Sequence, residues 1–463
     1  MFAVRRGDVI YRADYDFHTP RFRAIRSIIE KGIYPSAELG SLCSAIITGF
    51  AAGRDAQAHD DEEGIPHIRP LNVTSSGEFT LEGTKRVPLT SVSASDLLSQ
   101  GEVLFNNTNS MAWVGKSTVF DDLTPCVCSN HITRLVLKPE VANPYYLAEL
   151  LNALRGMRLF ELLATHFNNQ SGINTYTLSS LRVPVPDIQQ QRELVAVMQA
   201  ARERRAQLLR EADEQFASID AFLLDTLGLN TNFAENKSTC AIRAKQLQGA
   251  INPERYLGLH LEKLILQIGH TSIGDIGNIQ EFKMNPSTTF ADNLCDLIRI
   301  DDLPNNPLGV EHIRTEAGAD MQGSFFFVEH EDILLARLGP TLLNRKIVLC
   351  PKPQRQTFAS PEFLVIRCFP NWNPLFVNWM LRTSLYTRIM YSKARGSTPS
   401  RYRLIREDFV DTLFPLVSRE KQDTLAHEIQ LRLNKVSSLR AEAEQGWERA
   451  KAEFERRLLG ASD

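Results

Sequence analysis

The chain lacks any apolar run close to the ~20 residues that a membrane-spanning helix requires. Its start, Met1–Asp8, is basic, but no apolar segment follows, so we expect no secretory signal. Seven cysteines, without the pairing typical of metal ligands, indicate reduced thiols. The closest pair, Cys126 and Cys128, fits one face of a strand better than a redox site. These features predict a cytoplasmic protein.

The usual motifs of catalysis and cofactor binding are also missing. The sequence has no phosphate-binding loop of the Gly-x-x-x-x-Gly-Lys-Ser/Thr type and no Gly-x-Gly cluster after a strand. It has no His/Cys spacing that would hold zinc, and residues such as His131 and His427 fit a strand or a helix face better than a catalytic role. We therefore expect no enzyme activity, no metal and no cofactor in this chain.

Charge is nearly balanced. A net charge of −3 argues against a strongly basic, free-standing nucleic-acid binder. Either the protein does not contact nucleic acid, or its positive charge is local and partners supply the rest. At 463 residues, with 43% hydrophobic and 23% charged residues, the chain fits two ordinary globular domains better than one.

What the chain does contain is an internal repeat at a spacing of about 230 residues. The repeated segments are 67–69 and 297–299, 101–105 and 331–335, 143–146 and 373–376, and the turns and helices that follow Pro186 and Pro415. Because the offset is nearly constant, we interpret the repeat as a duplicated domain. Two copies can present related surfaces about a pseudo-two-fold axis, which suits a partner with two half-sites, and DNA is the commonest such partner.

Each half begins with a mixed α and β region. Strands are predicted at 102–105, 113–119 and 132–137, and a helix that begins at Asn143-Pro144 continues to Leu163. A polar loop follows at 166–172, and the prolines at 184 and 186 predict an extended end to the domain. The second half predicts a helix through Phe376 and Leu385 and then a loop at 392–403.

Each half ends in a long helix. Asp187 and Gln190 form a capping-box pattern, and the second long helix is predicted from about Ser418 to Leu459. Residues from Gly228 to Ser238 form the predicted hinge between the halves. Apolar residues step by three and four along both helices, which predicts an antiparallel coiled coil that fixes the distance between two binding faces. The apolar positions are Leu194, Met198, Ala201, Leu208, Ala212, Phe216, Ile219 and Leu223, and then Leu425, Ile429, Leu433, Val436, Leu439, Ala443, Trp447, Ala450, Phe454 and Leu458.

The order of these segments resembles the specificity (S) subunit of type I restriction-modification systems. The segments that carry the resemblance are Gly172, 181–186 and 190–193 in the first half, and 396–398, 414–416 and 419–422 in the second. The resemblance covers essentially the whole chain and rests on order and duplication rather than on any one motif. The segment Phe414-Pro415-Leu416 departs from it because it lacks the double proline.

The resemblance implies an α+β protein that reads DNA without catalysing a reaction. It implies target-recognition domains at 1–186 and 229–417, a central helix at 187–228 and a C-terminal helix at 418–463. Each domain would contact one part of a split DNA sequence. Two methyltransferase (M) subunits would methylate adenine N6 from S-adenosylmethionine, and motor-nuclease (R) subunits would join. S-adenosylmethionine, ATP and Mg would bind only to these partners, and the family serves phage defence.

One motif has two interpretations. Asn143-Pro144-Tyr145-Tyr146 is similar to the Asn-Pro-Pro-Tyr motif of adenine methyltransferases. The alternative is a helix start, with Asn as the cap and Pro at the first helical position. The second half has Asn373-Pro374-Leu375-Phe376 at the same place, and no cofactor-binding glycines lie near either copy. We therefore expect a helix cap.

The second half contains the clearer DNA-binding pattern. From Arg382 to Arg406 the chain has seven basic residues, three interleaved tyrosines and no acidic residue. Guanidinium groups suit phosphates and guanine, and hydroxyl groups suit phosphates. A solvated basic helix and loop is the alternative. The candidate residues are Lys393, Arg395, Ser397, Thr398, Arg401, Tyr402 and Arg403, with Arg337, Arg345 and Lys346 on a second loop that could share the face.

In the first half the candidates are rich in side-chain amides, which can pair with adenine. They are Asn106, Asn107, Asn109, Asn168, Asn169, Gln170 and Ser171. Ordinary turn chemistry is an equally good explanation for asparagine runs. Arg69 and Arg299 occupy equivalent positions in the repeat, and either a phosphate contact or a buried ion pair would explain them.

Two other functions remain open from the sequence. The chain could be the DNA reader of another methylation-based defence system, such as a fused methyltransferase-nuclease. It could also be a coiled-coil adaptor without DNA, whose globular modules bind proteins. The recognised bases and the gap between half-sites do not follow from the sequence.

Overall fold

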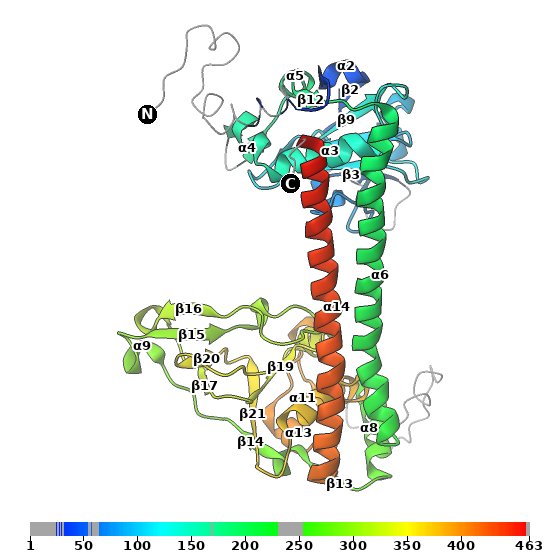
Figure 1. Cartoon of the computed structure of the whole chain (residues 1–463). Coiled ribbons are helices and arrows are strands. Elements are labelled where there is room, and N and C mark those ends of the chain that lie inside the picture. Colours follow the sequence, from blue (N-terminus) through cyan, green and yellow to red (C-terminus); the bar gives the residue numbers. More distant parts are fainter. Residues whose placement is uncertain are drawn as a thin grey trace. The chain divides into compact units, whose positions relative to one another are not determined.

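A computed structural model describes residues 32–53, 64–167, 170–229 and 253–459, together with the single residues 25, 27, 29 and 57. The chain divides into two compact units: unit 1 contains residues 1–207 and 442–463, and unit 2 contains residues 208–441. Each unit therefore combines one globular module with parts of two long helices (Figure 1). None of the described helices is long and apolar enough to cross a membrane.

The module of unit 1 is built on two main sheets. The first has the strand order β2-β9-β5-β7 and the second has the order β4-β3-β8. Smaller sheets are formed by β1 with β12 and by β10-β11-β6. The strands are β1 Ser36–Glu38, β2 Cys43–Thr48, β3 Ile65–Ile68, β4 Lys85–Val87, β5 Glu102–Asn106, β6 Thr108–Asn109, β7 Ser117–Phe120, β8 Val127–Cys128, β9 Ile132–Leu137, β10 Thr165–Phe167, β11 Gln170–Gly172 and β12 Arg182–Pro184.

The module of unit 2 repeats this topology, with one more strand, β17, in its second sheet. Its main sheets have the orders β14-β21-β18-β19 and β16-β15-β20-β17, and β13 pairs with β22 as β1 pairs with β12. The strands are β13 His270–Ser272, β14 Gly277–Ile279, β15 Leu294–Ile298, β16 Arg314–Ala317, β17 Phe326–Val328, β18 Ile333–Ala336, β19 Ile347–Leu349, β20 Thr357–Ala359, β21 Phe363–Cys368 and β22 Leu413–Pro415. The duplicated domain expected from the sequence is therefore visible as a repeated strand order.

The module of unit 1 contains the helices α2 Leu39–Leu42, α3 Pro144–Gly156, α4 Leu159–Leu163 and α5 Thr175–Ser179. The module of unit 2 contains α8 Pro253–Leu266, α9 Pro286–Thr289, α10 Gly339–Leu343, α11 Pro374–Arg382, α12 Ser384–Lys393 and α13 Arg406–Val410. Helices α3 and α5 of unit 1 correspond through the repeat to α11 and α13 of unit 2. Short 3-10 turns lie at η4 Pro70–Asn72, η5 Leu89–Ser91, η6 Ala94–Asp96, η8 Ile273–Asp275, η9 Ile300–Asp302, η10 Gly318–Asp320 and η11 Pro399–Arg401.

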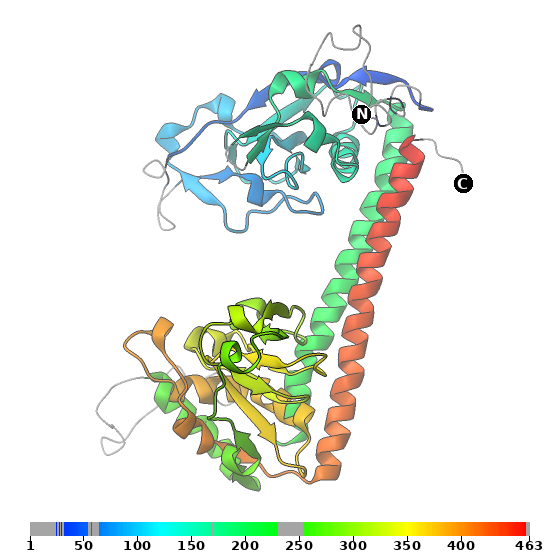
Figure 2. The ribbon, with the colours of Figure 1, turned by 90° about the vertical axis from the view of Figure 1, so that its left-hand side faces the viewer.

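Two long helices, α6 Ile188–Thr226 and α14 Arg419–Leu459, complete the fold. They lie side by side in both views (Figures 1 and 2). In unit 1, Arg204 pairs with Glu442 and Arg205 with Glu444, while Arg202 lies over Trp447. From Arg202 with Trp447 to Arg204 with Glu442, and in unit 2 from Asp213 with Arg440 to Ser218 with Arg432, the α14 number falls as the α6 number rises, so the helices are antiparallel. In unit 2 the same seam buries Leu208, Ala212, Ile219, Leu223, Leu425, Ile429, Val436 and Leu439. The fold class expected from the sequence is confirmed.

The predicted starts of the long helices are also confirmed. The backbone N–H of Gln190 donates to the carboxylate of Asp187 at 2.9 Å, and the Asp187 N–H donates to the Gln190 side chain at 3.3 Å. This reciprocal pair is the capping box expected there. The predicted hinge at 228–238 lies outside the described residues from position 230 onward.

Three local expectations were wrong. The helix predicted from Asn143 to Leu163 is two helices, α3 and α4, because Arg158 adopts a left-handed conformation with φ 62°. In unit 2, Thr383 separates α11 from α12, with extended backbone and a side chain that caps α12. The strand predicted from Trp113 begins only at Ser117, since residues 111–115 form a turn that returns the chain to β5.

Candidate nucleic-acid interface

A small three-stranded ribbon brings together the two amide-rich candidate segments of unit 1. β11 pairs with β10 on one side and with β6 on the other. Asn109 lies directly opposite Ser171, and Thr108 lies opposite Gly172, although 62 to 64 positions separate them in the sequence. Asn109 is partly exposed and Gln170 is exposed, so both side chains can reach solvent. The sequence suggested both segments but could not place them side by side.

Two asparagines of this group point into the fold instead. Asn106 is fully buried and donates to the Trp113 carbonyl at 3.0 Å. Asn107 is 5% exposed and donates to the hydroxyl of Thr133 at 2.9 Å and to the Asn130 carbonyl at 3.1 Å. These bonds hold the start of the ribbon in place. Ser171 is also buried and lies 2.8 Å from the His166 ring, and Asn168 and Asn169 lie outside the described residues.

Large apolar side chains around this ribbon were not identified from the sequence. Met111, Trp113 and Phe167 are each more than 40% exposed. Lys116 lies over the Trp113 ring, with its ammonium 5.5 Å from the ring centroid. Exposed aromatic rings next to amides and a cation can stack on bases as well as pack against protein. The sequence signal was the aromatic residue Trp113, which was predicted to begin a strand.

Unit 2 contains an equivalent ribbon of three paired segments, and two of the paired residues are arginines. Arg403 forms antiparallel bridges to Arg395 on one side and to Leu338 on the other. Through the repeat, Arg403, Arg395 and Leu338 correspond to Gly172, Thr165 and Thr108 of unit 1, which pair in the same pattern. The same backbone device therefore presents amides in one unit and guanidinium groups in the other.

The cations of this ribbon have acidic neighbours that are distant in sequence. Arg395 pairs with Asp408, and Arg337 and Arg403 both contact Glu362, at 3.3 and 3.2 Å. Burial acts to raise the pKa of Glu362, but hydrogen bonds and charge from the two arginines outweigh it, so the pKa lies below its usual value. The segment 382–406 lacks acids in sequence, yet its positive field is partly neutralised in space.

The loop between the two ribbon arginines is the most accessible part. Ser397, Thr398 and Arg401 are exposed, and the Thr398 hydroxyl lies 3.2 Å from that of Ser400. A Cβ atom at Gly396 would lie 2.5 Å from the Arg401 carbonyl oxygen, so this tight turn requires glycine. The loop thus holds hydroxyl groups and one exposed guanidinium at the end of the ribbon.

Tyr402 anchors this loop to the module. Its ring lies 5.9 Å from that of Tyr391, and the side chain packs against the main core of unit 2. The ring of Tyr402 is therefore only partly available to a ligand.

Three predicted cations are held elsewhere. Lys393 contacts Glu262 at 2.6 Å and the Thr412 hydroxyl at 3.0 Å. Lys346 donates to the Ile300 carbonyl at 3.1 Å. Arg345 pairs with Asp220 of α6 at 3.3 Å. The structure therefore brings Arg337 to the ribbon, as expected, but neither Arg345 nor Lys346.

Arg69 and Arg299 occupy equivalent places, each directly before a 3-10 turn. Both are half-buried, and neither forms an ion pair with any residue that the structure describes. The Nε atom of Arg69 is buried without a hydrogen-bond partner there. Of the two explanations open from the sequence, a buried ion pair has no support within the described residues.

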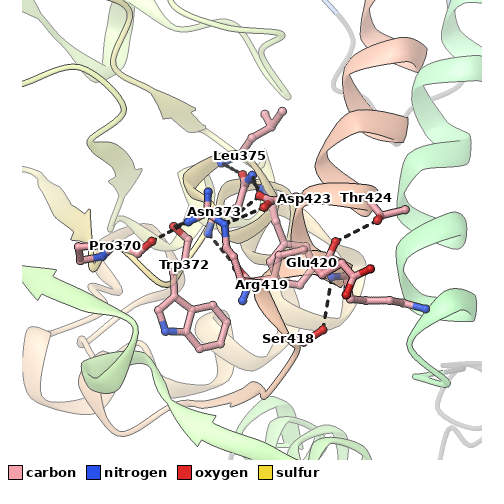
Figure 3. Close-up of polar contacts among 12 residues, drawn as sticks. Pro370, Trp372, Asn373, Leu375, Ser418, Arg419, Glu420, Asp423 and Thr424 are labelled. Atoms are coloured by element: carbon pink, nitrogen blue, oxygen red, sulfur yellow. Dashed lines mark hydrogen bonds and ion pairs between the residues drawn. The ribbon is translucent and has the colours of Figure 1, made fainter.

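The Asn-Pro segments are helix caps, as expected. The Asn143 side chain accepts the backbone N–H groups of Tyr145 and Tyr146, at 2.9 and 3.3 Å. Asn373 does the same for Leu375 and Phe376, at 3.0 and 3.2 Å. Its side-chain nitrogen also donates to Asp423 at 2.7 Å (Figure 3). Both asparagines therefore use their side chains in local structure.

Within the described part of the chain, no group of three His, Cys, Asp or Glu side chains could hold a metal ion. The six cysteines described there are free thiols, and all but the half-buried Cys368 are buried. Burial raises the pKa of the Cys126 and Cys128 thiols to about 12. These thiols pack as apolar side chains.

Comparison with known proteins supports the resemblance. No protein-family model matches the chain. A curated relative, the putative type I restriction enzyme MjaX specificity subunit of Methanocaldococcus jannaschii, is 26% identical over 152 residues, which are 32% of this chain and 35% of the relative. The match thus spans about one third of the relative's length.

Among solved structures, a chain from a study of complex assembly and conformational transition of the type I R-M system has a TM-score of 0.50 and 14% identity. The match covers 93% of this chain and 97% of that one, and it shows a shared fold. A type I S subunit from M. genitalium and an HsdS subunit from Thermoanaerobacter tengcongensis match at the same identity, with TM-scores of 0.43 and 0.38. They also cover 93% of this chain, and 96% and 97% of their own.

Proposed function

We propose, from the resemblance to type I specificity subunits that these comparisons support, that the chain recognises a bipartite DNA target. One observation carries the proposal. The two units share the strand order of the first main sheet and an equivalent ribbon. The ribbon carries Asn109 and Gln170 in unit 1, and Arg395, Arg403 and the adjoining loop residue Arg401 in unit 2. One backbone design with two sets of side chains suits two half-sites of different sequence.

The chemistry of each ribbon assigns the roles. Arg401, Ser397 and Thr398 would contact phosphates and fix the orientation on the duplex. The ribbon arginines would exchange their carboxylate partners for phosphate or a guanine edge. In unit 1, Asn109 and Gln170 would read base edges. The buried Asn106 and Asn107 would hold the ribbon that carries them in position.

The remaining parts of the proposal follow from the resemblance. The chain would not catalyse a reaction itself. It would direct two M subunits, which methylate adenine N6 with S-adenosylmethionine, and R subunits, which use ATP and Mg, on cytoplasmic DNA in phage defence. Target-recognition domains would extend over 1–186 and 229–417, and the helices 187–228 and 418–463 would set the gap between half-sites.

The test is to express the chain with its methyltransferase partner and map methylated adenines in the host DNA by single-molecule sequencing. A single split motif with a fixed internal gap is the expected result. Exchanging one domain for that of another such protein should change one half-site and leave the other and the gap intact. A stable complex that adds no methylation would reject the proposal and favour the adaptor function.

The identity of the partner separates the two kinds of DNA reader. Separate methyltransferase and motor subunits are expected for a type I system. A single fused methyltransferase-nuclease in the purified complex would assign the chain to the other defence system, while the split motif would remain.

A further inference from the structure

A cavity of about 430 Å³ in unit 2 lies beside the helix pair and the C-terminal end of α11. Its size is within the range of sites for small ligands, roughly 300–1,000 Å³. Phe216 and Asp220 of α6, Arg440 of α14, and Trp379 and Arg382 of α11 all line it. It contains no part of the ribbon, so the DNA proposal does not account for it.

Arg382 carries a buried charge without a counter-ion. Its side chain is 2% exposed, and its guanidinium group donates to the Asn306 side chain at 2.8 Å. The guanidinium carbon lies 4.1 Å from the centroid of the Trp379 ring and 5.7 Å from that of Phe216. The Nε atom has no hydrogen-bond partner in the described structure. A buried charge that is not paired is costly, so this arrangement calls for a negative group.

The nearby carboxylates are already engaged. Asp220 pairs with Arg345 at 3.3 Å and accepts the backbone N–H of Ser384 at 2.9 Å. Asp213 pairs with Arg440 at 3.1 Å. Three guanidinium groups therefore face two carboxylates around this cavity, which leaves one positive charge. Burial, together with the positive charge of Arg345, lowers the pKa of Arg382 from its usual value.

Unit 1 has an equivalent cavity, and there the charges balance. It is lined by Ser75, Ser76 and Trp447, which match Asn305, Asn306 and Phe216 through the repeat. Around it three cations, Arg155, Arg202 and Lys451, face three carboxylates, Glu149, Glu448 and Glu455, and the 6% exposed Glu149 pairs with Arg202. The uncompensated charge of unit 2 is therefore a property of that unit and not of the duplicated fold.

We propose that the cavity of unit 2 binds a small oxyanion, for which inorganic phosphate is the reference ligand, with Arg382 as its main charge partner. A guanidinium group holds an oxyanion through paired N–H donors, and such charge-assisted bonds are strong where water is excluded. Arg345 and the Asn306 amide also line the cavity and would add further donors. The bound anion would stabilise unit 2 by supplying the missing negative charge.

The test measures thermal unfolding of the full-length chain in increasing inorganic phosphate, with chloride adjusted to keep ionic strength constant. A saturable rise in the unfolding midpoint is expected. Phosphate also stabilises proteins in general through exclusion from their surface, but that effect does not saturate. The line width of the ³¹P NMR signal of phosphate gives an independent measure of binding.

The matched variant is Asn306→Asp, which places a carboxylate where the amide now accepts from Arg382. Asn306 has φ 49°, a conformation that Asp also tolerates. We expect a higher midpoint without phosphate and loss of the saturable response, because the protein then carries its own counter-ion. Arg382→Met should weaken phosphate binding by at least about tenfold. A phosphate response unchanged in Asn306→Asp, or no ³¹P broadening with the wild-type chain, would overturn the proposal.

Discussion

The side-chain oxygen of Gln422 accepts the backbone N–H of Asn373 at 2.8 Å, across 49 positions of sequence. The nitrogen of the same amide donates to the Val417 carbonyl at 2.8 Å. Gln422 thereby joins the start of α14 to the start of α11 and to the chain just before α14. In unit 1, Gln191 makes the same bond to Asn143 at 2.8 Å and donates to the Pro186 carbonyl at 2.8 Å. The amide joins each module to its long helix.

Gln422→Ala should therefore destabilise unit 2 strongly. Gln422 is 1% exposed, and its loss leaves a buried N–H and a buried carbonyl without partners. Each such group costs about 1–3 kcal/mol, so we expect a loss of about 2–6 kcal/mol of unfolding free energy. Urea unfolding measures this through the transition midpoint. Gln430→Ala, on the exposed face of the same helix, is the control and should change stability by less than about 0.5 kcal/mol.

The sequence predicted this junction only in part. Repeated segments such as Pro186 with Gln191 and Pro415 with Gln422 identified where each long helix begins, because caps and prolines act over a few residues. The duplicated architecture followed from the constant offset. The bond from Gln422 to Asn373 did not, since nothing local in either segment requires it.

The sequence likewise predicted the local segments of the candidate interface but not their long-range contacts. The segment around Arg395 and Arg403 was found as a basic run without acids. In the structure, Asp408 pairs with Arg395 and Glu362 with Arg403. Arg345 instead pairs with Asp220 of α6. In unit 1, Asn106 is buried at the end of β5, which pairs with β9, while Phe167 of β10, which pairs with β11, is exposed. Long-range pairing of this kind has no signal in one sequence.

Unit 1 contains a buried ion pair between Glu102 and Arg134. Glu102 and Arg134 are 5% and 6% exposed, and both oxygens of the carboxylate accept guanidinium N–H groups at 2.7 Å. Arg134→Met would leave a buried carboxylate unpaired, at a cost of about 3–5 kcal/mol. The double variant Glu102→Gln with Arg134→Met should recover part of that loss because the charge is gone. If the double variant unfolds at a lower urea concentration than Arg134→Met alone, the unpaired Glu102 carboxylate is not the cause of the destabilisation.

The thiols allow a prediction about pH. Burial raises the pKa of Cys126, Cys128, Cys350 and Cys368 to about 12, from a usual value of 9.0. A shift of three units lowers the thiolate fraction at pH 8 by about 1,000-fold, and thiolate is the form that iodoacetamide alkylates. In a Cys240→Ser variant, these native thiols should resist alkylation at pH 8, react faster as pH rises, and react fully in denaturant. Rapid labelling of the folded variant at pH 8 would contradict this account.

The DNA proposal makes a graded prediction for the arginines of unit 2. Arg401 is exposed on the loop and would contact phosphate. Arg401→Ala should therefore weaken binding to all sequences alike. It should also reduce the slope of log binding constant against log salt concentration by about one. Arg403 lies on the ribbon, and if it reads a base, Arg403→Ala should relax one position of one half-site by ~1–3 kcal/mol. Arg395→Ala should also weaken binding. Titrating labelled target DNA at several salt concentrations, with substituted half-sites, measures both effects.

The control for these variants is an arginine or lysine of similar exposure away from the ribbon. Lys435 on α14 is 55% exposed and pairs with Glu211 at 3.7 Å, so Lys435→Ala removes the same charge from the helix pair. It should leave affinity and target choice unchanged. The second half-site, which unit 1 would read, should be altered by Asn109→Ala and not by Arg403→Ala. Unchanged affinity and target choice in Arg395→Ala, Arg401→Ala and Arg403→Ala would remove the ribbon of unit 2 from the DNA interface, because no other described segment there combines as many exposed cations and hydroxyl groups.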